Sequence, residues 1–178
     1  MAAATSALVL RDFVNSFEPQ TAEERWGEPD ALHGWLVGHG LVTSEQRLTD
    51  VELEHVRQIR EGLRQTLRQH AGHDGEGPAI RRMNELIALH APRIRIEASG
   101  ISLHVDASRA IDHVVAGVAA AVQACEADGS WMRLKACDRE TCQWAYLDES
   151  RNRSRRWCSM NGCGNVLKMR RRSERAHV

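Results

Sequence analysis

The chain of 178 residues lacks the features of a membrane or secreted protein. No apolar run approaches the roughly 20 residues that a membrane-spanning helix needs. No basic segment precedes the N-terminal apolar stretch, so a secretory signal is not expected. With 42% hydrophobic and 27% charged residues, the composition is typical of a soluble globular protein. We therefore expect a cytoplasmic protein without a membrane partner.

Motifs that support catalysis are also missing. The sequence contains no HExxH motif, no nucleophile elbow and no P-loop, and the glycines of residues 72–78 do not match a phosphate-binding loop. His70 and His73 have a spacing that suits a metal, but they flank a predicted helix end, and we interpret them as loop histidines. We expect neither enzymatic activity nor a catalytic residue.

Lysine is scarce, and the basic charge is unevenly distributed. Of 24 basic residues, 22 are arginine, whose planar guanidinium binds two phosphate oxygens at once. Residues 1–130 carry 12 Arg against 19 Asp and Glu, a net charge of −7, whereas residues 131–178 carry 12 basic against 5 acidic residues, a net charge of +7. This asymmetry favours a basic tail that meets a polyanion over a surface whose charges compensate one another.

Apolar periodicity predicts a mostly helical N-terminal domain over residues 1–128. Helical spacing covers residues 8–17, 29–37, 50–70 and 79–90 and a last helix that Ser108 caps. Segments 93–97 and 101–105 alternate strictly and are joined by three residues that include Gly100, which predicts a β-hairpin. Cys125 lies on the apolar stripe of the last helix and is expected to be a buried thiol. Residues 128–130 form the predicted boundary.

A row of arginines follows one face of the predicted helix 50–70. Its members are Arg57, Arg60, Arg64 and Arg68. The row could contact an anion, but the interpretation that we favour is a solvated face paired with Glu54 and Glu61.

The other four cysteines form two pairs in the C-terminal segment 131–178. Cys137 and Cys142, like Cys158 and Cys163, are separated by four residues, and 15 residues separate the pairs. Four thiolates fill a zinc tetrahedron and leave no open position, which predicts one structural Zn²⁺ per chain. A [4Fe–4S] cluster uses the same ligands, and disulfides would need an oxidising compartment. The segment has few apolar residues, so metal is expected to help it fold.

The elements around the cysteines predict a small treble-clef-like finger. Residues 144–147 and 155–157 read as two short strands, 148–154 as their turn, and 165–176 as a basic helix. The fold class expected for the whole chain is α+β: a mostly helical domain with a β-hairpin, followed by the finger. We expect each part to have its own core.

The cysteine segment resembles the CGNR zinc finger. The resemblance rests on Cys137-x4-Cys142, Trp144, Asp148 and the run Ser150-Arg151-Asn152-x-Ser154-Arg155-Arg156-Trp157-Cys158-Ser159-Met160-x-x-Cys163-Gly164-Asn165. Where the family's namesake motif ends in Arg, this chain has Val166. The N-terminal part resembles the helical ABATE domain of the same bacterial family of stress-induced transcription regulators. Its matching pieces are Phe13-Val14-Asn15-Ser16, Leu32-x-x-Trp35-Leu36, Ile59-Arg60-Glu61-x-Leu63 and Met83-Asn84-x-Leu86.

Basic side chains on both sides of the second cysteine pair predict a nucleic-acid-binding surface, because they neutralise phosphates and release counterions. They are Arg151, Arg153, Arg155, Arg156, Lys168, Arg170, Arg171, Arg172 and Arg175. We expect a zinc-dependent DNA-binding transcription regulator. The alternative is a zinc-stabilised protein-interaction module without nucleic-acid binding, anchored by Trp144, Tyr146 or Trp157, although packing over the metal is the more natural role of these aromatics.

The size of the finger bears on its partners. A single small finger buries little surface on DNA, so a homodimer is a reasonable expectation. In a two-part regulator the N-terminal domain would be the sensor or dimerisation part, and an unknown small-molecule effector would be its partner. Nothing in its residues identifies that ligand.

Overall fold

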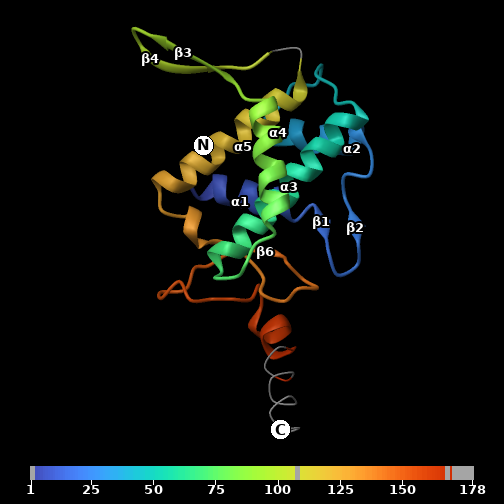
Figure 1. Ribbon diagram of the computed structural model, residues 1–178, viewed down its shortest axis with the longest axis vertical. Coiled ribbons are helices and arrows are strands. Elements are labelled where there is room, and N and C mark those ends of the chain that lie inside the picture. Colours follow the sequence, from blue (N-terminus) through green and yellow to red (C-terminus); the bar gives the residue numbers. More distant parts are fainter. Residues whose placement is uncertain (1–2, 107–108, 167–168, 170–178) are drawn as a thin grey trace.

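A computed structural model describes residues 3–106, 109–166 and 169, and its fold is α+β (Figure 1). Its α-helices are α1 (Ala3–Val14), α2 (Pro29–Gly38), α3 (Asp50–His70), α4 (Gly77–Leu89) and α5 (Ala110–Ala127). Its strands form antiparallel hairpins: β1 (Phe17–Glu18) with β2 (Glu23–Glu24), β3 (Arg93–Glu97) with β4 (Gly100–His104), and β5 (Leu134–Ala136) with β6 (Ala145–Leu147). We call residues 3–128 the body and residues 131–166 the finger.

The helices lie where apolar periodicity predicts them, with small shifts at their ends. Helix α3 has the predicted bounds because Thr49 and Glu52 form a capping box at its start, in which the backbone N–H of each donates to the side chain of the other. Helix α1 ends at Val14, three residues earlier than predicted, and the two-residue strands β1 and β2 follow, which the sequence did not indicate. Helix α5 begins at Ala110, and its predicted cap, Ser108, lies outside the described residues.

Helix α3 crosses α4 at very short range. A Cβ atom on Gly62 would lie 2.3 Å from the Cβ of Met83 and 2.9 Å from the Ala79 carbonyl oxygen. Only glycine therefore fits at this crossing. The contact places α3 at the centre of the body, with α1, α4 and α5 around it.

The core of the body is apolar and contains an aromatic cluster. The rings of Phe13, Trp26 and Trp35 meet edge to face at centroid distances of 5.1 to 5.9 Å. Cys125 is fully buried among apolar side chains, as predicted. Helix α5 is long and apolar enough to cross a membrane by length and composition alone, but its buried face packs in this core, as in the core helix of a soluble protein.

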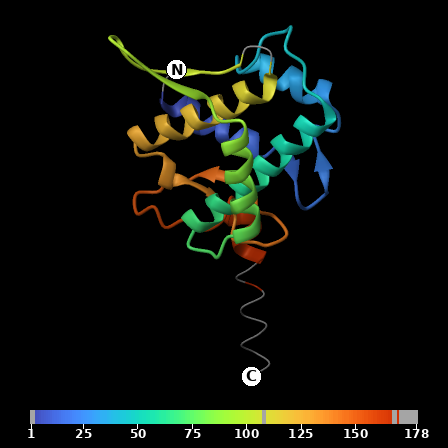
Figure 2. The same cartoon turned by 45° about the horizontal axis from the view of Figure 1, so that its top comes forward.

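The hairpin β3–β4 projects away from the helices, and the finger lies toward the other end of the molecule (Figures 1 and 2). Within β3–β4, the pairing of Ile94 with Leu103 and of Ile96 with Ile101 confirms the predicted hairpin. Ile94 and Ile96 are 68% and 82% exposed. The hairpin therefore contributes little to the core.

The hairpin of the finger differs from the predicted one. Strand β6 pairs with β5, with Lys135 opposite Tyr146, and residues 155–157 form no strand. The reason is burial, because Leu134 and Ala136 are fully buried against the body. The segment after Ser154 is held by separate bonds, in which the Tyr146 hydroxyl donates to the Arg155 carbonyl and the Asp138 N–H donates to the Arg156 carbonyl. The first cysteine pair consequently lies in the loop between β5 and β6.

The expectation of two separate cores is wrong. Leu134, Ala136 and Ala145 of the finger belong to the same buried cluster as the body's apolar residues. Strand β5 packs on α3 and β6 packs on α1. The finger hairpin is thus part of the main core, while the division at residues 128–130 stays a prediction.

Candidate metal centre and nucleic-acid interface

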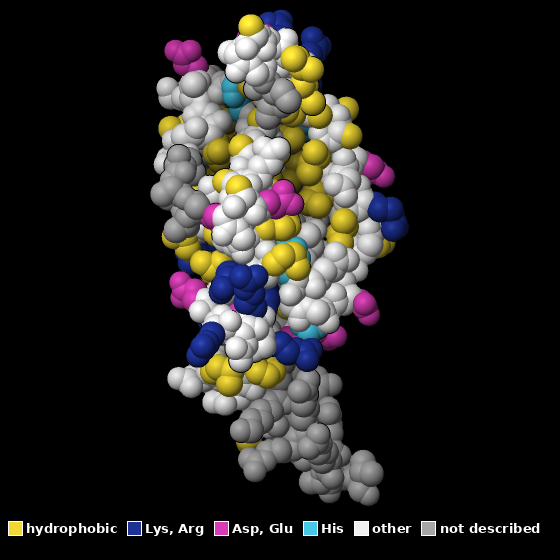
Figure 3. Space-filling model, turned by 90° about the vertical axis from the view of Figure 1, so that its left-hand side faces the viewer, with side chains coloured by type: hydrophobic (Ala, Val, Ile, Leu, Met, Phe, Trp, Pro, Cys, Tyr) yellow, Lys and Arg dark blue, Asp and Glu magenta, His cyan; other side chains and the backbone are white. Residues whose placement is uncertain are grey.

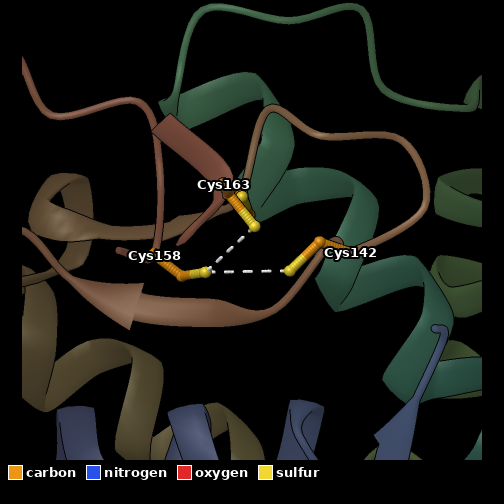
Figure 4. A group of neighbouring side chains, drawn as sticks. Cys142, Cys158 and Cys163 are labelled. Carbon is orange, nitrogen blue, oxygen red and sulfur yellow. Dashed lines mark hydrogen bonds between the residues drawn. The ribbon is translucent and has the colours of Figure 1, made fainter. Parts of the chain in front are cut away.

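The four predicted ligand cysteines converge on one point of the finger. Figure 4 shows three of them, Cys142, Cys158 and Cys163. The sulfurs of Cys137, Cys142, Cys158 and Cys163 all lie within 4.8 Å of one another. The Cys142 and Cys158 sulfurs are 3.7 Å apart, and those of Cys158 and Cys163 are 3.8 Å apart. The spacing of the two pairs therefore brings together a single site.

Two tight turns present the sulfurs. In the first, the backbone N–H groups of Cys142 and Gln143 donate to the Arg139 carbonyl, and Gln143 adopts a φ of 48°. In the second, a π-helical turn (Met160–Gly164), the Gly162 N–H donates to the Ser159 hydroxyl. Each turn points its two thiols in the same direction, as a knuckle requires.

The sulfur separations fit a tetrahedral metal. A Zn–S bond of about 2.3 Å implies sulfur–sulfur distances of about 3.8 Å in a regular tetrahedron. A four-iron cluster would place its own iron and sulfide atoms between the thiolates and force them further apart. The measured distances also exceed the bond of about 2.05 Å in a disulfide. The four thiols therefore have the separations that a tetrahedral metal site requires.

Without a cation, these thiols could not all ionise. A hydrogen bond with Cys137 raises the pKa of Cys142 far above its ordinary value and raises the pKa of Cys158 to about 12. Hydrogen bonds from Cys142 and Cys158 lower the pKa of Cys137 to about 2. One thiolate thus suppresses the ionisation of its neighbours, and a metal dication held by the four sulfurs would allow all of them to be negative.

Aromatic side chains cover the cysteine cluster. Trp144 and Trp157 pack against the sulfurs. The Tyr146 hydroxyl donates to the Arg155 carbonyl at 2.8 Å, and the Arg155 guanidinium lies 5.0 Å from the centre of the Tyr146 ring. These contacts assign the aromatics to the packing of the finger.

A buried ion pair anchors the long loop between the two cysteine pairs. Lys135 Nζ lies 2.7 Å from Asp148 Oδ2 and also donates to the carbonyls of Arg153 and Arg155. Asp148 additionally accepts from the Ser150 N–H and hydroxyl and from the Arg155 N–H. Burial alone would raise the pKa of Asp148, but these bonds outweigh it and lower the pKa to about 2. The backbone of the loop is therefore held in place by this buried ion pair and its hydrogen bonds.

The predicted nucleic-acid contacts fall into three groups. Arg151, Arg153 and Arg156 are exposed on the anchored loop, with Arg156 also 3.2 Å from Asp138. Arg155 is half-buried, and its guanidinium donates to the carbonyls of Trp157 and Cys158, so it is engaged within the finger. The rest lie outside the described residues: Lys168, Arg170, Arg171, Arg172 and Arg175. Figure 3 shows Lys and Arg side chains gathered on this end of one face.

Polar side chains of the body hold the finger. The Asn15 side chain donates to the Ala145 carbonyl at 2.9 Å and accepts from its N–H at 2.8 Å, which continues the pairing of β6. Arg64, 1% exposed, donates to the carbonyls of Gln143, Val14 and Phe17. These bonds connect the residue after Cys142 directly to α1 and α3.

The interpretation of the arginine row as a solvated face is wrong for its two central members. Arg60 and Arg64 are buried, and Arg60 makes a two-point contact with Glu24, with distances of 2.8 and 2.6 Å. The expected pairing with Glu61 is present for both. The sequence did carry a signal for this burial, because a row of arginines between the apolar stripes of a helix can anchor neighbouring segments from buried positions.

His70 and His73 also belong to this contact. His70 Nδ1 lies 2.8 Å from the Leu134 carbonyl oxygen, and His73 Nε2 lies 3.1 Å from Asp138 Oδ1. Burial lowers the pKa of His70. The two histidines therefore dock the end of α3 onto the finger.

A helical body joined to a four-cysteine centre defines a two-part protein with a metal finger. Residues 7–129 match ABATE, a family described as "Putative stress-induced transcription regulator", and residues 133–176 match the CGNR zinc finger. The first match covers more than half of the chain, so the chain belongs to this family, and the resemblance noted from the motifs is confirmed. A search of curated proteins finds no match to the chain.

Proposed function

We propose that the four cysteines hold one structural Zn²⁺ and that the protein is a DNA-binding transcription regulator of the bacterial cytoplasm, without enzymatic activity. The family description supports regulation, and its wording supports a role in the stress response. The sulfur separations of 3.7 and 3.8 Å support zinc over an iron–sulfur cluster.

The observation that carries DNA binding is a basic loop fixed on the metal site. Arg151, Arg153 and Arg156 are exposed on a loop whose backbone is anchored by the Lys135–Asp148 pair. Because the loop is already ordered, these arginines lose little backbone entropy when they contact phosphates. Two such fingers in a homodimer would supply the contact area that one finger lacks.

The zinc-loaded chain should bind duplex DNA with a steep dependence on salt. Each phosphate contact contributes about −0.9 to the slope of log K against log salt, so roughly five contacts give a slope near −4 to −5. Fluorescence anisotropy with labelled duplexes measures this slope. No binding to DNA or RNA at low salt, with one zinc in place, overturns the proposed function.

Substitution of two arginines in the anchored loop measures how many of the phosphate contacts the loop makes. The double variant Arg151→Ala with Arg153→Asn should weaken binding to all sequences and flatten the slope by up to about 2. Asn suits position 153, where φ is 51°. The matched control is Arg81→Ala with Arg95→Ala, two exposed arginines of the body, which should leave the slope unchanged.

A substitution at position 166 tests for the opposite effect, a gain in DNA affinity. Val166 is 47% exposed, so Val166→Arg should leave the core intact. The variant restores the family's residue, and its affinity for DNA rises if this position faces phosphate. Sequencing of DNA crosslinked to the protein would then show whether binding concentrates at discrete sites, as a regulator requires.

A protein-interaction module is the second candidate. Met160, Val166 and Met169 are exposed apolar side chains beside the second cysteine pair. Such residues are common at contacts between proteins. This function becomes the leading one if zinc is present and nucleic-acid binding is absent.

A further inference from the structure

A pocket of about 550 Å³ lies between the body and the finger. One wall consists of the outer face of α1 and the end of α2, and the other consists of β6 and the segment that follows it. The Asn15–Ala145 pair described above lies where the walls meet, and Cys158 reaches the finger side. This volume is within the range of sites for small molecules, and a ligand here would touch both parts of the protein.

The lining of the pocket provides flat aromatic surfaces. Trp35 is half-buried and stacks on His39 with ring centres 3.9 Å apart. Trp144 faces the pocket from the finger and is also half-buried. Partly exposed indole rings on both walls favour a planar aromatic ligand.

Among the residues that the structure describes, the pocket has one unpaired cation, Arg25, where an anionic group can bind. Arg25 is exposed, and within the described part of the chain its side chain makes no hydrogen bond or ion pair. The hydrogen-bond partners of the Arg155 guanidinium are carbonyl oxygens, which leave its positive charge uncompensated. Arg11 is neutralised by Asp12 at 2.8 Å. The opposing charges left in the lining are Glu149, exposed at the pocket, and the Cys158 sulfur when it is ionised as a metal ligand.

From these features we propose that the pocket binds a small aromatic carboxylate, with the ring between the two walls and the carboxylate at Arg25. A guanidinium binds a carboxylate through two parallel hydrogen bonds, which a neutral amide of the same shape cannot accept equally. Glu149 repels the carboxylate. The pocket adjoins the metal centre at Cys158 but does not include the exposed arginines of the loop, and its ligand binds without DNA.

The test is calorimetric titration of the zinc-loaded full chain with three compounds that share one ring system: 1-naphthoate, 1-naphthamide and 1-naphthylmethylamine. We expect the carboxylate to bind about tenfold more tightly than the amide or the amine. No heat from millimolar naphthoate, or equal binding of the amide or the amine, overturns the proposal. Because DNA is absent from this titration, its outcome is independent of nucleic-acid binding.

Two variants with opposite expected effects complete the test. Arg25→Ala should weaken naphthoate binding about tenfold, whereas Glu149→Gln should strengthen it several-fold, because it removes the repelling charge. Both side chains are exposed, so neither change should disturb folding, which zinc content and circular dichroism verify. Arg95→Ala on the distant β3 is the matched control and should change nothing. Unchanged affinity in Arg25→Ala overturns the assignment of the carboxylate position.

Discussion

The body and the finger bury different kinds of side chain. The body buries large apolar residues such as Leu10, Phe13 and Leu63. The second buried cluster, in the finger, consists of cysteines with two tryptophans against them, and beside it lies the buried Lys135–Asp148 pair. The hydrophobic effect therefore dominates the folding of the body, whereas we expect the part of the finger around the cysteines to depend on a metal and on satisfied polar pairs.

The contact between the body and the finger shows that the two regions are not structurally separate, although they bury different side chains. Leu134 and Ala136 extend the apolar core into the finger, while Asn15 and Arg64 extend polar bonds from the body toward the cysteine turn. A perturbation of the metal site should therefore affect the loops of the finger first and the β5–β6 hairpin last. The following variants test this order, from the largest expected effect to the smallest.

Cys158→Ser should have the largest effect. It removes one of four thiolates from a site whose metal contributes on the order of 10 kcal/mol to the folding of comparable small units. Elemental analysis should show loss of zinc, and hydrogen exchange should show loss of protection over residues 148–164. Protection of Leu134 and Ala136 should persist, because the body covers them.

The control for this variant is Cys125→Ala, in the core of α5. It should retain one zinc per chain and lose only modest stability, because it removes a small buried thiol distant from the metal site. Loss of zinc from the control, or full zinc retention in Cys158→Ser, contradicts the assignment of the ligands.

Arg64→Ala should cost about 4 kcal/mol of unfolding free energy. It leaves the carbonyls of Val14, Phe17 and Gln143 without their shared donor and removes one of the two arginines that pair with Glu61. Chemical denaturation with zinc present measures the loss. Arg81→Ala on the exposed side of α4 is the control, and equal stability of the two variants would mean that Arg64 does not anchor the finger.

Asp148→Asn should cost about 3 kcal/mol, because it leaves the Lys135 ammonium buried without an opposite charge. The neighbouring exposed Glu149→Gln should leave the unfolding free energy unchanged. The wild-type pair also has a pH signature. The pKa of Asp148 is lowered to about 2 in the folded state, so its contribution is complete above the unfolded pKa near 4 and is lost as pH falls toward 2.

The smallest expected effect concerns a polar cluster within the body. His55 Nδ1 lies 3.1 Å from His90 Nε2, and His90 Nδ1 lies 3.1 Å from Asp112. Burial, followed by the charge of His90, lowers the pKa of His55, so the unfolded chain binds a proton more readily than the folded one. Stability should therefore fall as pH drops below about 6.5.

The comparison for this cluster is His55→Gln. Its denaturation midpoint should fall less between pH 7 and pH 5.5 than that of the wild type, because Gln does not titrate. His104→Gln, exposed on β4, should behave like the wild type. An identical pH dependence in all three proteins would show that the cluster does not titrate in this range.

Local patterns predicted the elements well. Apolar spacing located α2, α3 and α4, and strict alternation located β3 and β4. The capping box that begins α3 was recognised only in the structure. The strands β1 and β2 were not predicted, because a strand of two residues shows no periodicity. The pairing of β5 with β6 was not predicted for another reason. Leu134 and Ala136 form a strand because α3 packs over them, and the residues next to them in the sequence do not indicate this burial.

By itself, the sequence determined the cysteine set, because two C-x4-C pairs mark the four thiols and a short turn brings the two of each pair together. Only the tertiary structure decided how the finger is attached. Asn15 meets Ala145 across 130 positions, and Arg64 meets Gln143 across 79. Periodicity and spacing describe neighbours along the chain, whereas these bonds depend on how helices pack in space. For the same physical reason, Arg60 and Arg64 of α3 are buried anchors and not part of a solvated face.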